Sequence, residues 1–409
     1  MTLKVRKHRS QWRKYMVSII MIDSKSLRGI ENDYDRMRER RNWNMSEKQK
    51  QYTNRLIVQL RKELHENPEP SMHEINTKHI LMQFIAKHTH SIEIVDRGLW
   101  FYVVKKGKNH DVPIAFRADY DAVMCEDGCP RHLCGHDGHS AVLAGFSLWL
   151  DTVEVEKDVY LIFQPGEETG QGAKICADLL TDKNIAEVYG FHNIPGYKMN
   201  EIILHEHTFA CASTGMEIIL NGKQSHAAYP ERGINPAIAI SEIIQSMQDA
   251  MNEEHKGIVL GTVIGIEAGS DSYGVSAGKG ILRLTLRAEY PEEYKDFVHK
   301  IENKVIELAE QCGLSYRISY IEEFPATVNH KYCVEKIRNA ARELNIKVLC
   351  PDEPFRWSED FGYYLQKTKG AFWGIGCGEN HPGLHTAEYE FEDGIIDSAI
   401  EIYKRILNS

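Results

Sequence analysis

Leu161-Ile162-Phe163-Gln164-Pro165-Gly166-Glu167-Glu168 is the stretch that decides the fold. Its apolar first part predicts a buried strand, and the Pro-Gly pair that follows predicts a turn. The turn delivers two adjacent carboxylates beyond the carboxyl end of the strand, where open α/β sheets place their functional side chains. We therefore expect an α/β domain with its site at one edge of the sheet.

The segments around this strand alternate between apolar runs and helical patterns. Residues 46–87 carry apolar side chains at helical spacing, interrupted at Asn67-Pro68 and Pro70. The later elements are strands at 100–104, 114–117, 159–163 and 188–192, with helices at 141–150 and 173–180. This alternation favours an α/β fold with a mostly parallel central sheet.

A different pattern occupies the middle of the chain. It reads β-α-β-β-α-β, a split unit able to fold on its own, with strands at 216–220, 258–266, 281–288 and 316–321 and helices at 236–251 and 292–312. Because it separates Glu168 from His385, it must be an insertion. We predict a main domain in two parts, 46–207 and 323–409, an inserted lid at 208–322 and an N-terminal extension at 1–45.

The composition is that of a globular protein. Of 409 residues 42% are hydrophobic and 26% charged, and the net charge of −10 argues against binding to nucleic acid or a membrane surface. No apolar run is long enough to cross a bilayer. The nine scattered cysteines do not form the disulfide framework of a small secreted protein, so we predict a reducing, cytoplasmic location.

The first 45 residues differ from the rest. Six basic residues from Lys4 to Lys14 precede a short apolar run at 16–22. A secretory signal is one interpretation, but no small-residue cleavage site follows the run. We favour a disordered or loosely helical extension. Met45, directly before the N-cap residue Ser46, is a second candidate for the native start.

Cys134-Gly135-His136-Asp137-Gly138-His139 is the first candidate metal-binding stretch. Ligands two residues apart can point at one metal centre when glycine permits the turn between them. A glycine loop with hydrogen-bonded histidines is the simpler interpretation of this motif taken alone. A structural zinc site is a further alternative, with irregular spacing, built from Cys125, Cys129, His132 and Cys134.

The Glu167-Glu168 pair is the second candidate stretch. Adjacent carboxylates repel each other, so a cation is expected to hold them together. One carboxylate would ligate the metal, while the other takes a proton from an activated water molecule. A solvated turn is the alternative, but the apolar strand before it favours function. His192, at the end of the strand at 188–192, and His385 complete the set.

In this order the motifs resemble the peptidase M20 family, and most closely its amidohydrolase branch, the aminoacylase-like N-acyl-amino-acid amidohydrolases. The resemblance covers nearly everything after the extension. Its matching stretches are Arg117-Ala118-Asp119-Tyr120-Asp121-Ala122, Cys134 to His139, Phe163 to Glu168, Gly190-Phe191-His192, Ser225-His226-Ala227-Ala228, Ser358-Glu359-Asp360-Phe361 and Leu384-His385.

The resemblance implies a metallopeptidase-type catalytic domain with an inserted ferredoxin-like lid that serves for dimerisation. It implies two divalent ions per subunit, Mn²⁺ or Zn²⁺ with Co²⁺ as a further candidate, bound by Cys134, His136, Glu168, His192 and His385. Glu167 becomes the general base. His226 on the lid would stabilise the oxyanion, and in dimeric relatives the equivalent histidine reaches the neighbouring subunit's site. Asp119 and Asp137 look like groups that orient ligands.

Three departures from the family pattern concern substrate binding. Gly274-Val275-Ser276-Ala277 replaces an Asn-Val-Ile-Pro motif, and Trp357 lies near a usual Met. Thr285-Leu286-Arg287 replaces Thr-Val-Arg, so Arg287 keeps a guanidinium fork able to grip a substrate carboxylate.

The expected activity is hydrolysis of the amide bond in N-acyl or N-acetyl amino acids, with a homodimer formed through the lid. One alternative is a metallo-carboxypeptidase or dipeptidase acting on short peptides. A catalytically inactive binding protein on the same scaffold is the other alternative, and the complete set of ligands and Glu167 argues against it.

Overall fold

The computed structural model describes residues 47–409. The extension predicted at 1–45 and the helix start predicted at Ser46 lie outside these residues. The helix α3 spans Glu47–His65, and residues from Thr53 to Ser409 form one compact unit. Within the described residues no helix combines the length and the apolar character needed to cross a bilayer.

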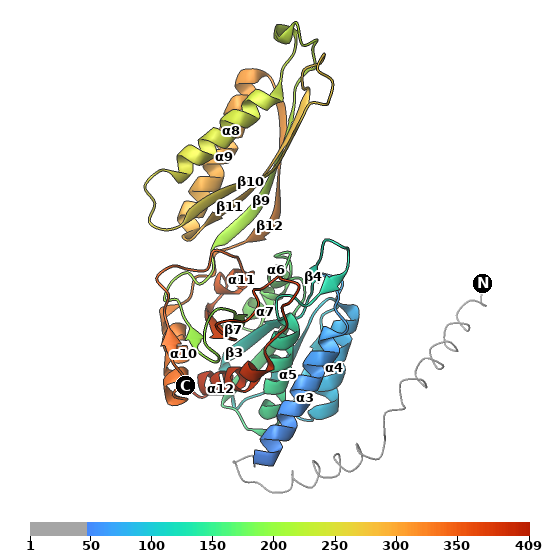
Figure 1. Ribbon diagram of the computed structural model, residues 1–409. Coiled ribbons are helices and arrows are strands. Elements are labelled where there is room, and N and C mark those ends of the chain that lie inside the picture. The colour runs from blue at the N-terminus through green and yellow to red at the C-terminus, as the bar shows by residue number, and fades with distance from the viewer. Residues whose placement is uncertain (1–46) are drawn as a thin grey trace, which may run out of the picture. The chain divides into compact units, whose positions relative to one another are not determined.

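An eight-stranded sheet forms the centre of the compact unit (Figure 1). Its strand order is β1-β2-β6-β3-β7-β14-β8-β13. The bounds are β1 Glu93–Asp96, β2 Phe101–Lys105, β6 Lys157–Gln164, β3 Asn109–Asp119, β7 Glu187–Ile194, β14 Lys369–Gly376, β8 Ile202–Ile203 and β13 Val348–Leu349. The four middle strands β6, β3, β7 and β14 are parallel, whereas β2 pairs antiparallel with both β1 and β6.

Helices cover both faces of this sheet. Successive residues of a strand point to opposite sides, so each strand contributes to two cores. Ile114 and Phe116 of β3 join the core beneath one helical layer, and Ala115 between them joins the core on the other face. The first core includes residues of α3, α4 (Ile75–His88), α5 (His136–Thr152), α10 (Lys331–Glu343) and α12 (Ile396–Leu407). The second includes residues of α6 (Gly172–Cys176), α7 (Asp178–Asp182) and α11 (Gly362–Leu365), so the helix predicted at 173–180 is divided in two.

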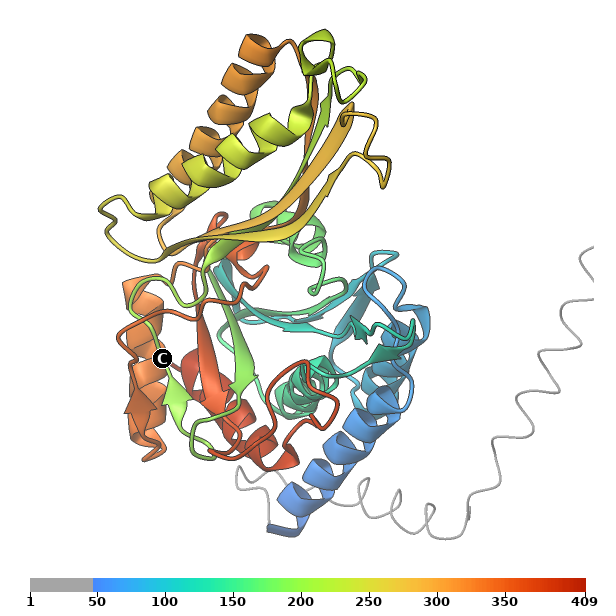
Figure 2. The same cartoon turned by 45° about the horizontal axis from the view of Figure 1, so that its top comes forward.

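The inserted segment forms a separate four-stranded antiparallel sheet, which we call the lid sheet. Its order is β10-β11-β9-β12, and the element bounds are β9 Ala212–Asn221, α8 Pro236–Met251, β10 Val259–Ala268, β11 Lys279–Ala288, α9 Pro291–Cys312 and β12 Ser315–Phe324. Figure 2 shows α8 and α9 on one face of this sheet, and the lid core lies between them and the strands. The short remaining elements are β4 Val123–Met124, β5 Pro130–Arg131, η1 Pro230–Arg232 and η2 Asp393–Ile395.

Candidate metal centre

The parallel strands bring distant motifs to one edge of the central sheet. Asp119, the last residue of β3, pairs in register with Gln164, the last residue of β6. His192 lies near the end of β7, which pairs with β3 on the other side. Parallel neighbours end at the same edge, so the Glu167-Glu168 turn and His192 meet there.

Gly135 makes the sharp turn between Cys134 and His136. Its φ of +96° lies in the left-handed region that favours glycine. A Cβ atom at this position would lie 2.4 Å from Asn193 Oδ1 and 2.5 Å from Tyr389 Oη, so no larger residue fits. The turn leaves Cys134 just before α5 and His136 as the first residue of that helix.

All five predicted ligands lie together. Cys134 Sγ is 3.4 Å from His192 Nε2. The Glu168 carboxylate stands between two histidines, with Oε1 3.7 Å from His136 Nε2 and Oε2 3.5 Å from His385 Nε2. Three overlapping groups each have ligand atoms within 4.8 Å of one another: Cys134, His136 and His192; Cys134, Glu168 and His385; and His136, Glu167 and Glu168.

Hydrogen bonds at the opposite ring nitrogens orient two of these histidines. His136 Nδ1 lies 3.0 Å from the Asp121 carboxylate, and His192 Nδ1 lies 2.8 Å from the Asn193 carbonyl. Both partners are acceptors, so each Nδ1 carries a proton and each Nε2 faces the cluster as the nitrogen that would bind a metal. Asp121 also accepts from the Glu168 N–H at 3.0 Å. It was missed as a site residue, although it stands in the quoted motif two positions after Asp119.

The two aspartates expected to orient ligands have different surroundings. Asp119 accepts from His139 Nδ1 at 2.7 Å and from Arg117 Nη1 at 2.7 Å, and its Oδ2 lies 3.8 Å from His136 Nε2. Asp137 instead bonds His65 Nδ1 at 2.8 Å and lies 3.7 Å from Arg61. Neither partner is one of the five predicted ligands, because Asp137, at the second position of α5, faces away from the cluster.

A buried acidic group stands behind Glu167. Glu167, Glu359 and Asp360 each offer an oxygen within 4.8 Å of the others, and the Asp360 N–H donates to Glu167 Oε1 at 3.3 Å. Burial, reinforced by the charges of Glu359 and Asp360, raises the pKa of Glu167 well above its ordinary value. The fully buried Arg117 offsets this repulsion, with Nη2 3.0 Å from Glu359 and 2.6 Å from Asp360.

The cluster carries an excess of negative charge that suits divalent cations. Hydrogen bonds from His385 to the Cys134 sulfur and the Glu168 carboxylate raise the pKa of His385 to about 10. Burial lowers the pKa of His136, but the charges of Asp119 and Cys134 outweigh it and raise the pKa well above its usual range. His136 Nε2 and Glu168 Oε1 are buried atoms with no hydrogen-bond partner. A thiolate, imidazoles and a carboxylate are together the donor set of zinc and related metals.

Comparison with known proteins identifies the family that has this architecture. The model of peptidase family M20/M25/M40 matches residues 115–409.

The chain belongs to this family.

An uncharacterized hydrolase of Staphylococcus epidermidis is 27% identical over 377 residues, which cover 85% of this chain and 96% of the relative. The IAA-amino acid hydrolase ILR1-like 4 of Arabidopsis thaliana is 28% identical over 341 residues, covering 78% and 77% of the two chains. The solved YXEP protein of Bacillus subtilis, described as a dinuclear metal binding peptidase from the M20 family, superposes with a TM-score of 0.72 at 22% identity, covering 87% and 98%.

These findings confirm the predicted family and fold class, an α/β catalytic domain with a largely parallel central sheet and a lid. The protein is therefore an M20 hydrolase, a metal-dependent enzyme of the amidohydrolase and peptidase type.

The cluster of predicted metal ligands in this M20 hydrolase opens into a pocket of about 270 Å³. Apolar side chains form part of its wall, namely Phe324, Trp357 and Leu384. Trp357 is held from two sides, because its ring centroid lies 4.9 Å from that of Phe355 and 5.5 Å from that of His192. The pocket thus combines a charged floor with a rigid aromatic wall.

The two predicted lid residues lie differently with respect to this pocket. Arg287 donates from Nη1 to Ser358 Oγ at 2.8 Å, and Ser358 lines the pocket. His226 is exposed and does not line the pocket. Its Nδ1 accepts the Ala228 N–H at 3.0 Å, so Nε2 carries the proton and is free to donate.

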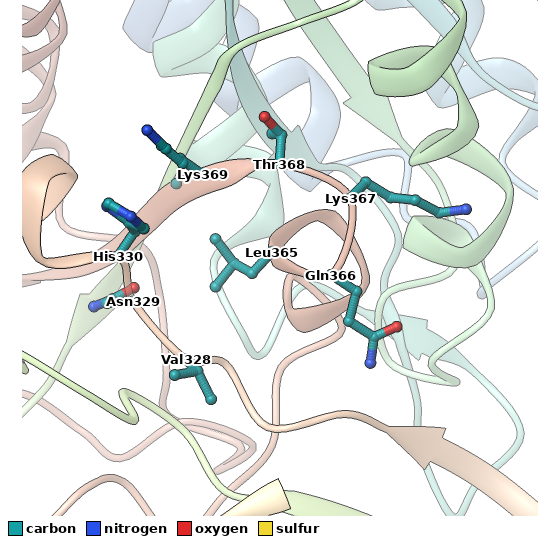
Figure 3. Close-up of a pocket in the computed structure, with 9 residues that line it drawn as sticks. Val328, Asn329, His330, Leu365, Gln366, Lys367, Thr368 and Lys369 are labelled. Atoms are coloured by element: carbon teal, nitrogen blue, oxygen red, sulfur yellow. The ribbon is translucent and has the colours of Figure 1, made fainter.

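A second cavity, of about 440 Å³, lies away from the metal cluster (Figure 3). Leu365 points into its middle, while the amines of Lys367 and Lys369 extend to opposite sides. Its polar wall residue Asn329 is already satisfied by the carbonyls of His205 and Phe372 and by the Phe372 N–H. None of its lining residues belongs to a candidate metal group of the described chain.

The alternative zinc site at Cys125, Cys129, His132 and Cys134 does not form. Among the described residues, neither Cys125 nor Cys129 belongs to a group of ligand atoms close enough to hold one ion. His132 is buried, and both of its ring nitrogens lack a partner.

Proposed function

We propose that this M20 hydrolase cleaves the amide bond of N-acyl amino acids, with Cys134, His136, Glu168, His192 and His385 holding two divalent ions. The observation that carries this proposal is the meeting of a thiol, three imidazoles and a carboxylate in one cluster, buried except for the exposed His385, beside the carboxylate of Glu167. Ions bound there would polarise the scissile carbonyl and lower the pKa of water to about 7.

Glu167 is the proposed general base. Its Oε2 lies 3.8 Å from His136 Nε2, so the carboxylate stands at the edge of the cluster and lines the pocket. Burial among other acids raises its pKa, and divalent cations bound beside it would favour the ionised form that accepts a proton. It would take a proton from the attacking water and then deliver it to the leaving amine. The Asp360 N–H holds it in place, and Arg117 in turn pairs with the Asp360 carboxylate.

The pocket wall supports a substrate with a carboxylate and an apolar group. Arg287 is the one proposed carboxylate-binding residue, since its guanidinium reaches Ser358 at the pocket rim. Trp357, Phe324 and Leu384 would pack against an apolar acyl group or side chain. The similarity to a plant IAA-amino acid hydrolase, whose name describes an amino-acid conjugate, agrees with this class.

Cleavage of short peptides by a metallo-carboxypeptidase or dipeptidase is the alternative. It is favoured by the description of the Bacillus subtilis structure as a peptidase. Both reactions use the same metal centre, so only substrates separate them. Chromatography of the products from matched N-acetyl amino acids and dipeptides decides between them: a higher kcat/KM on dipeptides would overturn the N-acyl assignment.

The metal's identity is part of the proposal. A sulfur ligand favours zinc, while the carboxylate also accepts manganese or cobalt. Stripped enzyme should regain activity with one of Mn²⁺, Zn²⁺ or Co²⁺ and bind about two ions per chain. A single ion per chain at saturation contradicts the binuclear assignment.

The decisive test of the mechanism is Glu167→Gln. It keeps the size of the side chain and removes the base, so kcat should fall by about 10²–10⁴. Metal content, measured by atomic emission, should stay unchanged because Glu167 is not a proposed ligand. Cys134→Ser is the matched comparison, and it should lose metal. Full turnover by the Glu167 variant would refute the assigned role.

We also propose a homodimer formed through the lid, in a reducing, cytoplasmic compartment. The edge strands β10 and β12 expose five large apolar side chains, Ile264, Ile266, Tyr316, Tyr320 and Ile321. Exposed edges with apolar side chains are typical pairing surfaces. His226, exposed on one subunit, would then serve its partner's site. All nine cysteines are free thiols, in agreement with reducing surroundings. Light scattering on Ile264→Lys tests the interface, because a persistent dimer would exclude β10.

A further inference from the structure

Two cysteines face each other across the short hairpin formed by β4 and β5. Val123 pairs with Arg131 and Met124 with Pro130, so the next opposed pair toward the turn is Cys125 and Cys129. The Cys125 N–H donates to the Cys129 carbonyl at 3.1 Å. Residues opposed in an antiparallel pair project from the same face, and the two thiols therefore share one side of the hairpin.

The backbone separation suits a disulfide. The Gly128 N–H closes the turn on the Cys125 carbonyl at 2.9 Å, with Gly128 at a φ of +78°. Directly opposed residues of antiparallel strands have Cα atoms about 4.5–5.5 Å apart. A disulfide spans Cα separations of about 4.4–6.8 Å. Little backbone movement is needed to join the two sulfurs.

The two thiols also differ in ways that suit sequential reaction. Cys129 is exposed, so it can meet a reagent from solution, whereas Cys125 is half-buried. The Arg131 guanidinium, which pairs with Asp127 at 2.5 Å, carries a positive charge near the Cys125 sulfur.

We propose that Cys125 and Cys129 form a reversible redox pair, oxidised by low-molecular-weight disulfides such as oxidised glutathione. The Cys129 thiolate attacks one glutathione sulfur, forming a mixed disulfide and releasing one glutathione thiolate. The Cys125 thiolate then attacks the Cys129 sulfur, forming the intramolecular disulfide and releasing the second glutathione. Two protein thiols lose two electrons and two protons in total, and one glutathione disulfide becomes two glutathione thiols.

The position of this pair links it to the metal centre. The hairpin is the segment between Asp121, which orients His136, and Cys134, a proposed ligand. Its two ends are anchored by the Ala122 N–H, which donates to Glu69 at 2.9 Å, and by the Leu133 carbonyl, which accepts from the His385 N–H at 2.7 Å. Exposed disulfides that close short loops are the reducible, regulatory kind.

The chain offers a matched control. Cys350 is also exposed and also lies beside an arginine, with Arg338 Nη1 3.6 Å from its sulfur. Its peptide after trypsin cleavage, 348–356, contains no second cysteine, whereas the peptide 118–131 contains both Cys125 and Cys129 and no other.

The experiment treats the full-length, manganese-loaded protein with oxidised glutathione, blocks free thiols with N-ethylmaleimide, digests with trypsin and identifies peptides by mass spectrometry. We expect peptide 118–131 to lose two hydrogens and carry neither label nor glutathione, and dithiothreitol to restore both labelling sites. Peptide 348–356 should carry glutathione. In Cys125→Ser, Cys129 should retain glutathione, because no second thiol resolves it.

The opposing result is equally clear. If the wild-type peptide 118–131 keeps glutathione on Cys129, as Cys350 does, the two sulfurs do not reach each other and the proposal is wrong. Full labelling of both cysteines under conditions that modify Cys350 overturns it as well.

Discussion

In the eight-stranded sheet β7 is buried along its whole length, whereas in the lid sheet β11 buries only every second residue. The first sheet is covered on both faces, and Asp119, His136 and Glu167 at its edge are buried, while His385 remains about half exposed. The lid sheet is covered on one face by α8 and α9, and its strands expose polar and apolar side chains alike. The central sheet therefore positions buried charges, while the lid offers the exposed surfaces that are proposed to meet a substrate or a partner.

Replacing the buried Arg117 should have the largest effect on stability, and it tests the contrast between the two sheets. Arg117→Met would leave Asp119, Glu359 and Asp360 buried without their counter-charge, which costs about 3–5 kcal/mol of unfolding free energy. The lid counterpart Arg283→Met, a partly exposed residue paired with Glu217, should lose far less stability, because solvent screens an exposed ion pair. Denaturant titration measures both. Equal losses would mean that burial does not distinguish the two regions.

His226→Ala tests whether the lid takes part in catalysis. If His226 stabilises the oxyanion, its removal should lower kcat by about 10²–10³. Because the side chain is exposed, the melting temperature and metal content should stay the same. His299→Ala, another exposed lid histidine, serves as the control and should leave kcat unchanged. A His226 variant with normal kcat would limit catalysis to the central domain.

Arg287→Met tests carboxylate recognition. A lost charge-assisted hydrogen bond is worth about 1.5–3 kcal/mol, so KM for an N-acyl amino acid should rise by about 10–100-fold with a smaller change in kcat. Arg283→Met, four residues earlier on the same strand, is the matched control and should leave KM unchanged. With a substrate whose carboxylate is replaced by an amide, wild type and Arg287→Met should no longer differ. A persistent difference would assign Arg287 another role.

His205 gives the smallest expected effect, on pH dependence. Burial lowers its pKa to about 4, and its Nε2 lacks a partner. The unfolded chain therefore protonates His205 at a higher pH than the folded protein does. The contribution of neutral His205 to the free energy of unfolding is fully present above pH 6.5 and is lost as the pH falls toward 4. His205→Leu should reduce the loss between pH 7 and pH 5 by about 1–2 kcal/mol in denaturant titrations. An unchanged pH dependence would show that His205 is solvated.

Several elements could be predicted because their patterns are local. The helix 236–251 was predicted with the bounds that the structure gives it, since Asn235 accepts the Ala237 N–H and Pro236 begins the helix. The lid strands followed from their alternation. The antiparallel pairing of β2 was not predictable, because an apolar strand has the same sequence pattern in either direction.

The residues of the candidate site also differ in whether the sequence alone could assign them. The five proposed ligands and Glu167 could be named from short motifs, each tied to a turn after a strand. Asp121 and Arg117 were not assigned their contacts, since these join Asp121 to His136 and Arg117 to Asp360, far along the chain. The opposition of Cys125 and Cys129 also required the hairpin register.

By itself the sequence determined the types of ligand, the order of the elements and the presence of an inserted lid, because each depends on side-chain chemistry and on short-range periodicity. Only the tertiary structure decided which nitrogen of His136 faces the cluster, which acids stand behind Glu167, and that Asp137 turns toward His65. The physical reason is that these properties arise from hydrogen bonds and charges between segments that meet only when the strands pair.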